Sequence, residues 1–375
     1  MDFTLTEQEK MLRSLAKDFA LKEVAPRAAD IDRTNEFPSD LAARFADLGF
    51  RGLPYPAAYG GGSAGYLGFL LALEQICYAS VSAGAVMAVN TVPQEGIFRF
   101  GTEEQKRRLL TPLAAGKELG GIGFTEPDTG SDPRMIKTVC RPHRDGYLIT
   151  GQKMFMSLAP VLNKVLLFAA RSDGEGLNCF IAEPASPAFA VQEVLETMGI
   201  RGMGTSIVNI DDLFVPGENL LGEEGKGFAI LLEAISVERM SVAMQAVAVA
   251  QASLDASLEY ARQRIAQGKP IAKMQAIQQL LAEMAGKIEA ARWLVYRVGF
   301  LRDQGRNIQY ESSMAKVFAS SVAVEVTSLA MQVHGSFGTM KSLPVERFYR
   351  DAKMTEIYVG SSEVHRSIVA ANLVR

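Results

Sequence analysis

One carboxylate of this chain has neighbours that suit proton abstraction. Glu238 lies in the stretch 234–243, and at helical spacing its neighbours are Leu231, Ile235 and Val242. Because residues at these spacings share one face of a helix, the sequence places Glu238 on an apolar face. Burial raises the pKa of a carboxyl group, which suits a general base working near neutral pH. The alternative is a buried structural ion pair with Arg239 or another arginine.

A second candidate is the stretch 350–366, in which two charged, helix-like halves meet at Val359, Gly360, Ser361 and Ser362. Gly360 allows the backbone to approach a ligand closely, and a serine can cap the helix that follows. A helix N-terminus also favours anions such as pyrophosphate. On its own, this pattern is more typical of an ordinary corner between helices, because turns of Gly and Ser are common.

A third candidate is the glycine- and hydroxyl-rich stretch 121–132. Thr125 and Ser131 can donate hydrogen bonds to a polar heterocycle or a phosphate. Glu126 and Asp132 would repel a phosphate, so we expect them to fix the loop itself.

Composition and charge exclude several classes of protein. The 375 residues carry a net charge of −3 with acids and bases interspersed, which predicts neither nucleic-acid nor membrane binding. The three cysteines fit neither a disulfide framework nor a zinc site, and the histidines form no metal-ligand set. No apolar run reaches the roughly 18 residues of a spanning helix, and the start lacks a signal peptide, so we expect a cytoplasmic protein.

The elements that position these residues fall into three predicted domains. Residues 1–118 show helical periodicity, with capping boxes at Thr6 and Thr102. Residues 119–227 show short apolar runs separated by turns, which predicts a β domain with strand spacings typical of a small barrel or sandwich, and we expect the barrel. Residues 228–375 return to helical periodicity and predict a four-helix bundle. The predicted fold is therefore mainly α with a central β domain.

Taken together, the motifs resemble the acyl-CoA dehydrogenase family. The resemblance rests on stretches 121–132, 151–157, 264–268 with Gln275, 332–338 and 350–366, in this order and spacing along the whole chain. It implies FAD bound between the β domain and the bundle of a homotetramer, with an acyl-CoA thioester against the flavin. It also implies an electron-transferring flavoprotein as the electron acceptor.

The resemblance assigns residues to the cofactor and the substrate. Around the flavin ring it implies contacts from Phe124, Thr125, Ser131, Phe155 and Ser157. Arg264 and Gln275 would reach the FAD of a neighbouring subunit, and further contacts would come from Gln332, Val333, His334, Gly335, Ser336, Ser361 and Glu363. The substrate would contact Ser131, Arg239, Val359 and Gly360. The sequence departs from the family pattern at Phe155 (usually Trp), Ser157 (Thr), Gln267 (Phe) and Ser336 (Gly).

The usual catalytic base of the family is missing. Most members carry a Glu immediately before the glycine of the 350–366 stretch, where this chain has Val359. In a subset that includes isovaleryl-CoA dehydrogenase, the base lies on the first helix of the C-terminal bundle, next to an Arg, and Glu238 with Arg239 match that pair. We therefore expect Glu238 to be the base, while the backbone N–H of Val359 still serves the thioester oxygen.

The predicted function is FAD-dependent α,β-dehydrogenation of an acyl-CoA, with a branched or cyclic acyl group favoured. The alternatives are an enoyl-CoA reductase or an acyl-carrier-protein-linked dehydrogenase of the same fold, or a non-catalytic homologue that binds CoA and flavin.

Overall fold

The N-terminal helices begin where side chains cap them. In the computed structural model, which describes residues 4–374, the hydroxyl of Thr6 accepts a hydrogen bond from the Glu9 N–H, and the Glu9 carboxylate accepts one from the Thr6 N–H. Thr102 and Gln105 repeat this arrangement, so both predicted capping boxes are confirmed. The helices are α1 (Glu7–Phe19), α2 (Ala28–Thr34), α3 (Ser39–Asp47), α4 (Gly65–Ala79), α5 (Val81–Val89), α6 (Thr91–Phe100), α7 (Glu103–Gln105) and α8 (Thr111–Ala114).

The central domain is an open, curled sheet, and the predicted barrel is wrong. Its strands are β1 (Gly120–Gly123), β2 (Val139–His143), β3 (Gly146–Met156), β4 (Lys164–Arg171), β5 (Leu177–Ala182), β6 (Phe189–Val194) and β7 (Ser206–Pro216). They follow the order β1-β4-β2-β3-β7-β6, with β5 on β4. Closure would require β5 to bond β6, and within residues 4–374 these edge strands do not pair. The first turns of α9 pack against β5 instead.

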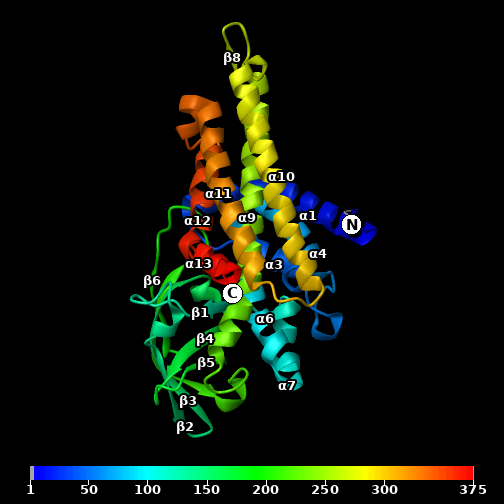
Figure 1. The fold of residues 1–375 in the computed structure, drawn as a ribbon. Coiled ribbons are helices and arrows are strands. Elements are labelled where there is room, and N and C mark those ends of the chain that lie inside the picture. Colours follow the sequence, from blue (N-terminus) through cyan, green and yellow to red (C-terminus); the bar gives the residue numbers. More distant parts are fainter. Residues whose placement is uncertain (1–3, 375) are drawn as a thin grey trace.

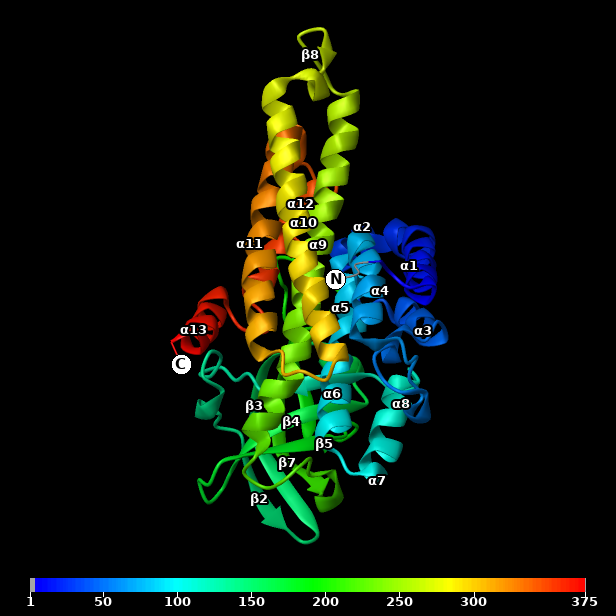
Figure 2. The same ribbon diagram turned by 45° about the vertical axis from the view of Figure 1, so that its right-hand side comes forward.

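The C-terminal domain is a helical bundle that rises above the sheet (Figure 1). Its long helices are α9 (Gly227–Gln263), α10 (Gln275–Asp303) and α11 (Gln309–His334), followed by α12 (Val345–Thr355) and α13 (Ser362–Leu373). A short hairpin, β8 (Ile265–Ala266) and β9 (Lys269–Pro270), closes the far end of the bundle. Figure 2 shows the N-terminal helices on one side of α9 to α11 and α13 on the other. The helical, β and helical order of domains is confirmed.

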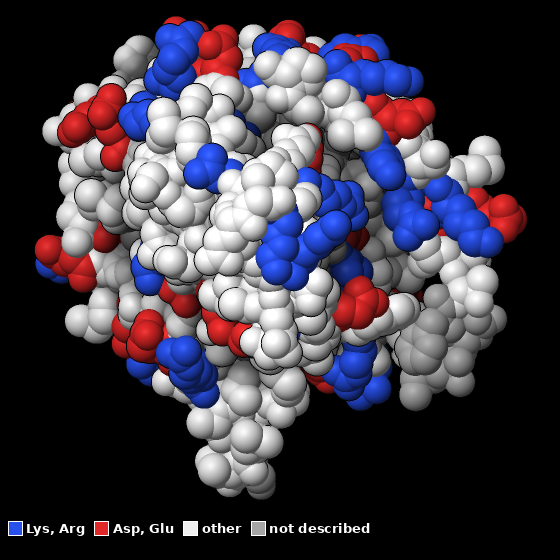
Figure 3. All heavy atoms as spheres, turned by 90° about the horizontal axis from the view of Figure 1, so that it is seen from above, with Lys and Arg blue, Asp and Glu red and all other residues white. Residues whose placement is uncertain are grey.

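One helical segment, 309–339, is long and apolar enough to cross a membrane by length and composition. The sequence expectation that no such run exists is therefore wrong. Half of that apolar window is buried, because α11 packs along α9 and α10. Its apolar character thus serves the core of the bundle. Viewed from the hairpin end, acidic and basic side chains are interspersed on the surface (Figure 3).

The cysteines are all buried and unbridged. Burial raises the pKa of the Cys140 thiol to about 11 and raises the pKa of Cys77 and Cys179 further. Each thiol therefore stays protonated and unreactive in the folded protein.

Candidate active site at the junction of the bundle and the sheet

Glu238 lies inside the protein, on the first part of α9. Only 6% of it is exposed, between the buried Leu231 and Val242. Within residues 4–374, its Oε2 atom has no hydrogen-bond partner and its carboxylate forms no ion pair. Burial raises the pKa of this carboxyl group to about 8. A carboxyl group in this state can accept or donate a proton near neutral pH.

Arg239 does not neutralise Glu238. It is also buried, its Nε atom has no partner among the described residues, and burial lowers its pKa to about 10. Successive residues of an α-helix point about 100° apart, which separates the two charged groups. The structural ion pair considered as an alternative is therefore absent from the described chain. Arg239 instead lines a cavity of about 460 Å³, together with Tyr310 of α11 and Ile368 of α13.

The hinge between α12 and α13 faces Glu238. The hydroxyl of Tyr358 donates a hydrogen bond to the side-chain oxygen of Gln245, which lies about two turns after Glu238 on the same face of α9. Burial, and then the nearby Glu238 carboxylate, raise the pKa of Tyr358. The structure therefore brings the two candidate stretches, 234–243 and 350–366, to one place.

The hinge has an unusual backbone. Val359 has a φ of 56° and Gly360 a φ of 94°. A left-handed conformation is rare for a β-branched residue, so surrounding contacts must hold it. The φ of Gly360 strains any residue with a side chain, and a Cβ atom there would also lie 2.9 Å from His365 Nε2. Ser361 caps α13, since its hydroxyl accepts a hydrogen bond from the Val364 N–H.

The sequence analysis missed two residues that hold this hinge. Lys316 of α11 donates from Nζ to the carbonyl oxygens of Tyr358 and Gly360, and His365 Nε2 lies 3.1 Å from the Val359 carbonyl oxygen. Burial and the Arg239 charge lower the pKa of Lys316 to about 7. Burial, Lys316 and Arg239 lower the pKa of His365 to about 3, so its ring is neutral and Nε2 is the donor.

The sequence around Lys316 contains a weak signal that this lysine is buried. The residues three and four positions away are small: Ser312, Ser313, Ala319 and Ser320. Such a lysine has room to bury its stem between helices.

The loop after β1 is fixed by a buried ion pair. Glu126 accepts hydrogen bonds from the N–H groups of Lys137 and Thr138, and from Lys153 Nζ of β3 at 2.7 Å. Both charged side chains are almost fully buried. The expectation that Glu126 fixes its loop is confirmed. Phe124 and Thr125, predicted to contact the flavin, are half-buried beside it.

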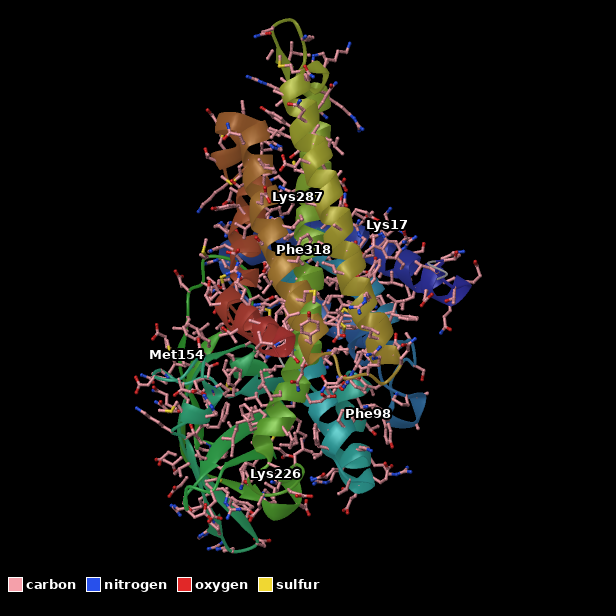
Figure 4. The ribbon with its side chains drawn as sticks, viewed as in Figure 1. Lys17, Phe98, Met154, Lys226, Lys287 and Phe318 are labelled. Carbon is pink, nitrogen blue, oxygen red and sulfur yellow. The ribbon has the colours of Figure 1, made fainter. Side chains whose placement is uncertain are left out.

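The end of β3 presents an aromatic ring to solvent. Phe155 is 58% exposed and has a φ of 56°, and Ser157 follows two residues later. Figure 4 marks the preceding Met154 at the edge of the sheet, below α13, with Phe318 higher on α11. Among the described side chains, the hydroxyls of Thr125, Ser131 and Ser157 form no hydrogen bonds. A stacking ring at the end of β3 and hydroxyl donors without a partner in the described chain are thus available in the central domain.

Seven further predicted cofactor residues lie at the far end of the bundle. Arg264 ends α9, and its guanidinium lies over the Phe337 ring at 5.6 Å. His334 stacks on Tyr260 with ring centroids 4.3 Å apart. Gln275, Gln332, Gly335 and Ser336 are exposed here, whereas the side chain of Val333 is buried. His334 is also buried, and its Nδ1 bonds the Ala330 carbonyl oxygen.

Two predicted residues of the hinge differ in their surroundings. Ser361 is half-buried at the start of α13, and the exposed Glu363 lies 3.5 Å from Arg366.

No group of three or more His, Cys, Asp or Glu side chains in residues 4–374 is arranged to hold a metal ion.

Comparison with known proteins identifies the family. The chain matches the models of the acyl-CoA dehydrogenase N-terminal domain over residues 6–117, the middle domain over 121–213 and the C-terminal domain over 225–374. This chain belongs to the acyl-CoA dehydrogenase family. It is 38% identical to the acryloyl-CoA reductase (NADH) of Anaerotignum propionicum, covering all of this chain and 96% of that protein. An acyl-CoA dehydrogenase of Bacillus subtilis is also 38% identical, with 99% of each chain covered.

Among solved structures, butyryl-CoA dehydrogenase from Megasphaera elsdenii matches with a TM-score of 0.98 and 35% identity over the full length of both chains. The enzymes of the acyl-CoA dehydrogenase family are oxidoreductases that act on a CH–CH group and depend on FAD.

Residues at the end of β3 and in the loop after β1 fit FAD, the cofactor of the acyl-CoA dehydrogenases. The exposed ring of Phe155 offers a stacking surface, and the unpaired hydroxyls of Thr125 and Ser157 offer donors to the polar edge of a flavin. The smaller Phe and Ser at positions 155 and 157 retain both properties of the residues usual at these places. Ring stacking and hydroxyl donation are therefore both available here.

Proposed function

We propose that Glu238 is the base with which this acyl-CoA dehydrogenase removes the α-proton of an acyl thioester. The observation that carries the proposal is a buried carboxyl group, without a partner in the described chain, beside the hinge. An unpaired buried carboxylate is costly to a fold, which supports a role in chemistry over a role in stability.

Val359 takes the place of the usual base and cannot accept a proton. Its backbone N–H donates no hydrogen bond within residues 4–374 and is free to bind the thioester oxygen. Such a donor stabilises the negative charge that develops on this oxygen as the α-proton leaves. The proton abstraction is thus assigned to α9, and the oxyanion contact to the hinge between α12 and α13.

The substrate is proposed to lie against the face of α9 that carries Glu238, next to the cavity that Arg239 lines between α9, α11 and α13. Beyond Glu238, the hydrogen bond between Tyr358 and Gln245 closes the same face of α9. Gln245 lies seven residues after Glu238, about 10 Å along the helix. This distance favours a short acyl group, branched groups included.

Bound FAD supplies the acceptor for the hydride that leaves the β-carbon. The predicted FAD contact Arg264 lies about 39 Å along α9 from Glu238, too far to serve a flavin that is bound beside Glu238 in the same chain. This separation supports a homotetramer in which the end of one bundle reaches the flavin of a neighbour. An electron-transferring flavoprotein is the proposed electron acceptor, and the cytoplasm the proposed compartment.

Anaerobic titration of the purified yellow protein tests the proposal. Straight and branched short-chain acyl-CoAs are added in turn, and flavin absorbance near 450 nm is followed. At least one thioester should bleach the wild-type flavin, and Glu238→Gln should keep FAD but lose the bleaching. Failure of every thioester, or bleaching of the variant at the wild-type rate, would contradict the proposal.

A reductase is the second candidate, and one observation favours it. With a pKa of about 8, Glu238 carries its proton at neutral pH and is ready to donate it to the α-carbon of an enoyl thioester. A relative named acryloyl-CoA reductase (NADH) matches the whole chain. Consumption of an enoyl-CoA by the reduced protein, without bleaching by any saturated acyl-CoA, would select this direction. Reaction only with a thioester on a carrier protein would favour the acyl-carrier-protein-linked dehydrogenase. Binding of CoA and flavin without any reaction would favour the non-catalytic homologue.

A further inference from the structure

Two side chains fix consecutive carbonyl groups of the hinge. Lys316 Nζ donates to the carbonyl oxygen of Tyr358 at 2.8 Å and to that of Gly360. His365 Nε2 donates to the carbonyl oxygen of Val359, which lies between them. These bonds determine the orientations of the peptide groups that join residues 358 to 361.

Fixing the Tyr358 carbonyl also fixes the N–H of Val359. The two belong to the same planar peptide group, and in a trans peptide the N–H points away from the C=O. No described residue accepts a hydrogen bond from this N–H. Lys316 therefore lies on one side of the peptide, and the free N–H points to the other.

Burying Lys316 at a corner between helices costs free energy, because an amine loses its contact with water. Its side chain is completely buried, and it forms no ion pair within residues 4–374. The charge of Arg239 lies near it and opposes its protonation. A buried amine without a carboxylate destabilises a fold unless its donors are fully used. The two hinge carbonyls are the acceptors that use them.

We propose that Lys316 is a positioning residue for the reaction: by holding the carbonyls of Tyr358 and Gly360, it aims the Val359 N–H at the thioester oxygen. The inference rests on the proposed function. In that step the α-carbon proton passes to the Glu238 carboxylate, and the electron pair of the broken C–H bond becomes the enolate, whose oxygen accepts the N–H hydrogen bond. Lys316 touches neither substrate nor cofactor and acts through the hinge.

The test is exchange of the substrate α-hydrogen with solvent. The FAD-loaded protein is incubated anaerobically in D₂O with the acyl-CoA that best bleaches the wild type, and deuterium in recovered acyl-CoA is measured by mass spectrometry. Lys316→Met keeps the length of the side chain and removes both hydrogen bonds. It should keep FAD, change KM by less than about threefold, and lower α-exchange and flavin reduction together by about 10- to 100-fold.

Controls separate positioning from general damage. Lys316→Arg retains donors and should keep most of the exchange. Lys17→Met, an exposed lysine on α1 far from the hinge (Figure 4), should behave as wild type. Backbone hydrogen exchange over residues 356–362 should accelerate in Lys316→Met. A merely structural lysine would lower FAD content or raise KM without changing exchange per bound flavin.

The outcomes are distinct. If the wild type exchanges no α-hydrogen with any acyl-CoA, the proposed function fails. If the wild type exchanges and loaded Lys316→Met exchanges equally fast, only the role of Lys316 is overturned. If Lys316→Met does not bind FAD, Lys316→Gln decides, because its side chain is too short to reach both carbonyl oxygens. In that variant, exchange per bound flavin should fall by at least about tenfold, and exchange at the wild-type rate overturns the inference.

Discussion

Replacing Glu238 by Gln should change both the pH dependence of activity and that of stability. Burial raises the pKa of this carboxyl group from 4.5 to about 8. In the folded protein the group therefore keeps its proton up to about pH 8, whereas the unfolded chain releases it near pH 4.5. Stability must fall as pH rises between these values, because the folded state binds the extra proton.

The size of the effect follows from the shift. Each pH unit between 4.5 and 8 weakens the fold by about 1.4 kcal/mol, so about 3 kcal/mol is lost between pH 6 and pH 8. Glu238→Gln removes the titrating group and this loss. The difference in thermal midpoint between variant and wild-type holoprotein should therefore grow by several degrees from pH 6 to pH 8 in favour of the variant.

Kinetics give the second readout. Because the base must lose its proton first, kcat/KM for an acyl-CoA should rise about tenfold per pH unit below pH 8 and then level off. Glu238→Gln should lower kcat/KM by about 10²- to 10⁴-fold. Glu259→Gln, which changes an exposed carboxylate on the same helix, is the matched control. A flat wild-type profile, with equal pH dependence of the two thermal midpoints, would refute the reasoning.

Three further predictions concern the surroundings of the site. Lys153→Met should destabilise the protein by about 3–5 kcal/mol in urea unfolding, because it leaves Glu126 buried without its ion-pair partner. Lys137→Met removes an exposed ion pair and should have little effect. Equal effects of the two substitutions would contradict this. Phe155→Ala should weaken FAD binding by about 0.5–1.5 kcal/mol, measured by fluorescence titration. Because the ring is exposed, the stability of the apoprotein should not change. A loss of apoprotein stability would show that Phe155 has a structural role. Gly360→Ala should reduce thermal stability and flavin reduction more than Gly305→Ala does. Gly360 has a φ of 94° and a Cβ there would lie 2.9 Å from His365, whereas Gly305 has a φ of 73° but open space around it. The reverse order would argue against a constrained hinge.

The order of domains was predictable because hydrophobic periodicity changes with the type of element. The burial of Glu238 was predictable for the same reason, because Leu231, Ile235 and Val242 place its side chain on the apolar face of the helix. The limits of α5 within the predicted helical domain were not predicted, because residues 81–89 are buried on every side and show no polar face. A helix without a polar face has no periodic signal.

The open sheet and the role of Lys316 were beyond sequence reasoning for another reason. Whether β5 and β6 pair depends on the register of strands far apart in the chain, and the glycine-rich β1 is a strand only because it pairs with β4. Likewise, the partners of Lys316 are carbonyl groups about 40 residues away, and every residue has a carbonyl. A contact made with the backbone leaves no pattern in the sequence of its acceptor.

The burial of Cys77, Cys140 and Cys179 has a practical consequence. A maleimide or iodoacetamide reagent will find no native target in the folded enzyme, so a cysteine introduced at an exposed position becomes the single point of attachment. A dye placed on the β8–β9 hairpin would then report how close the end of one bundle comes to the flavin of another molecule, without any need to remove a native sulfur atom first.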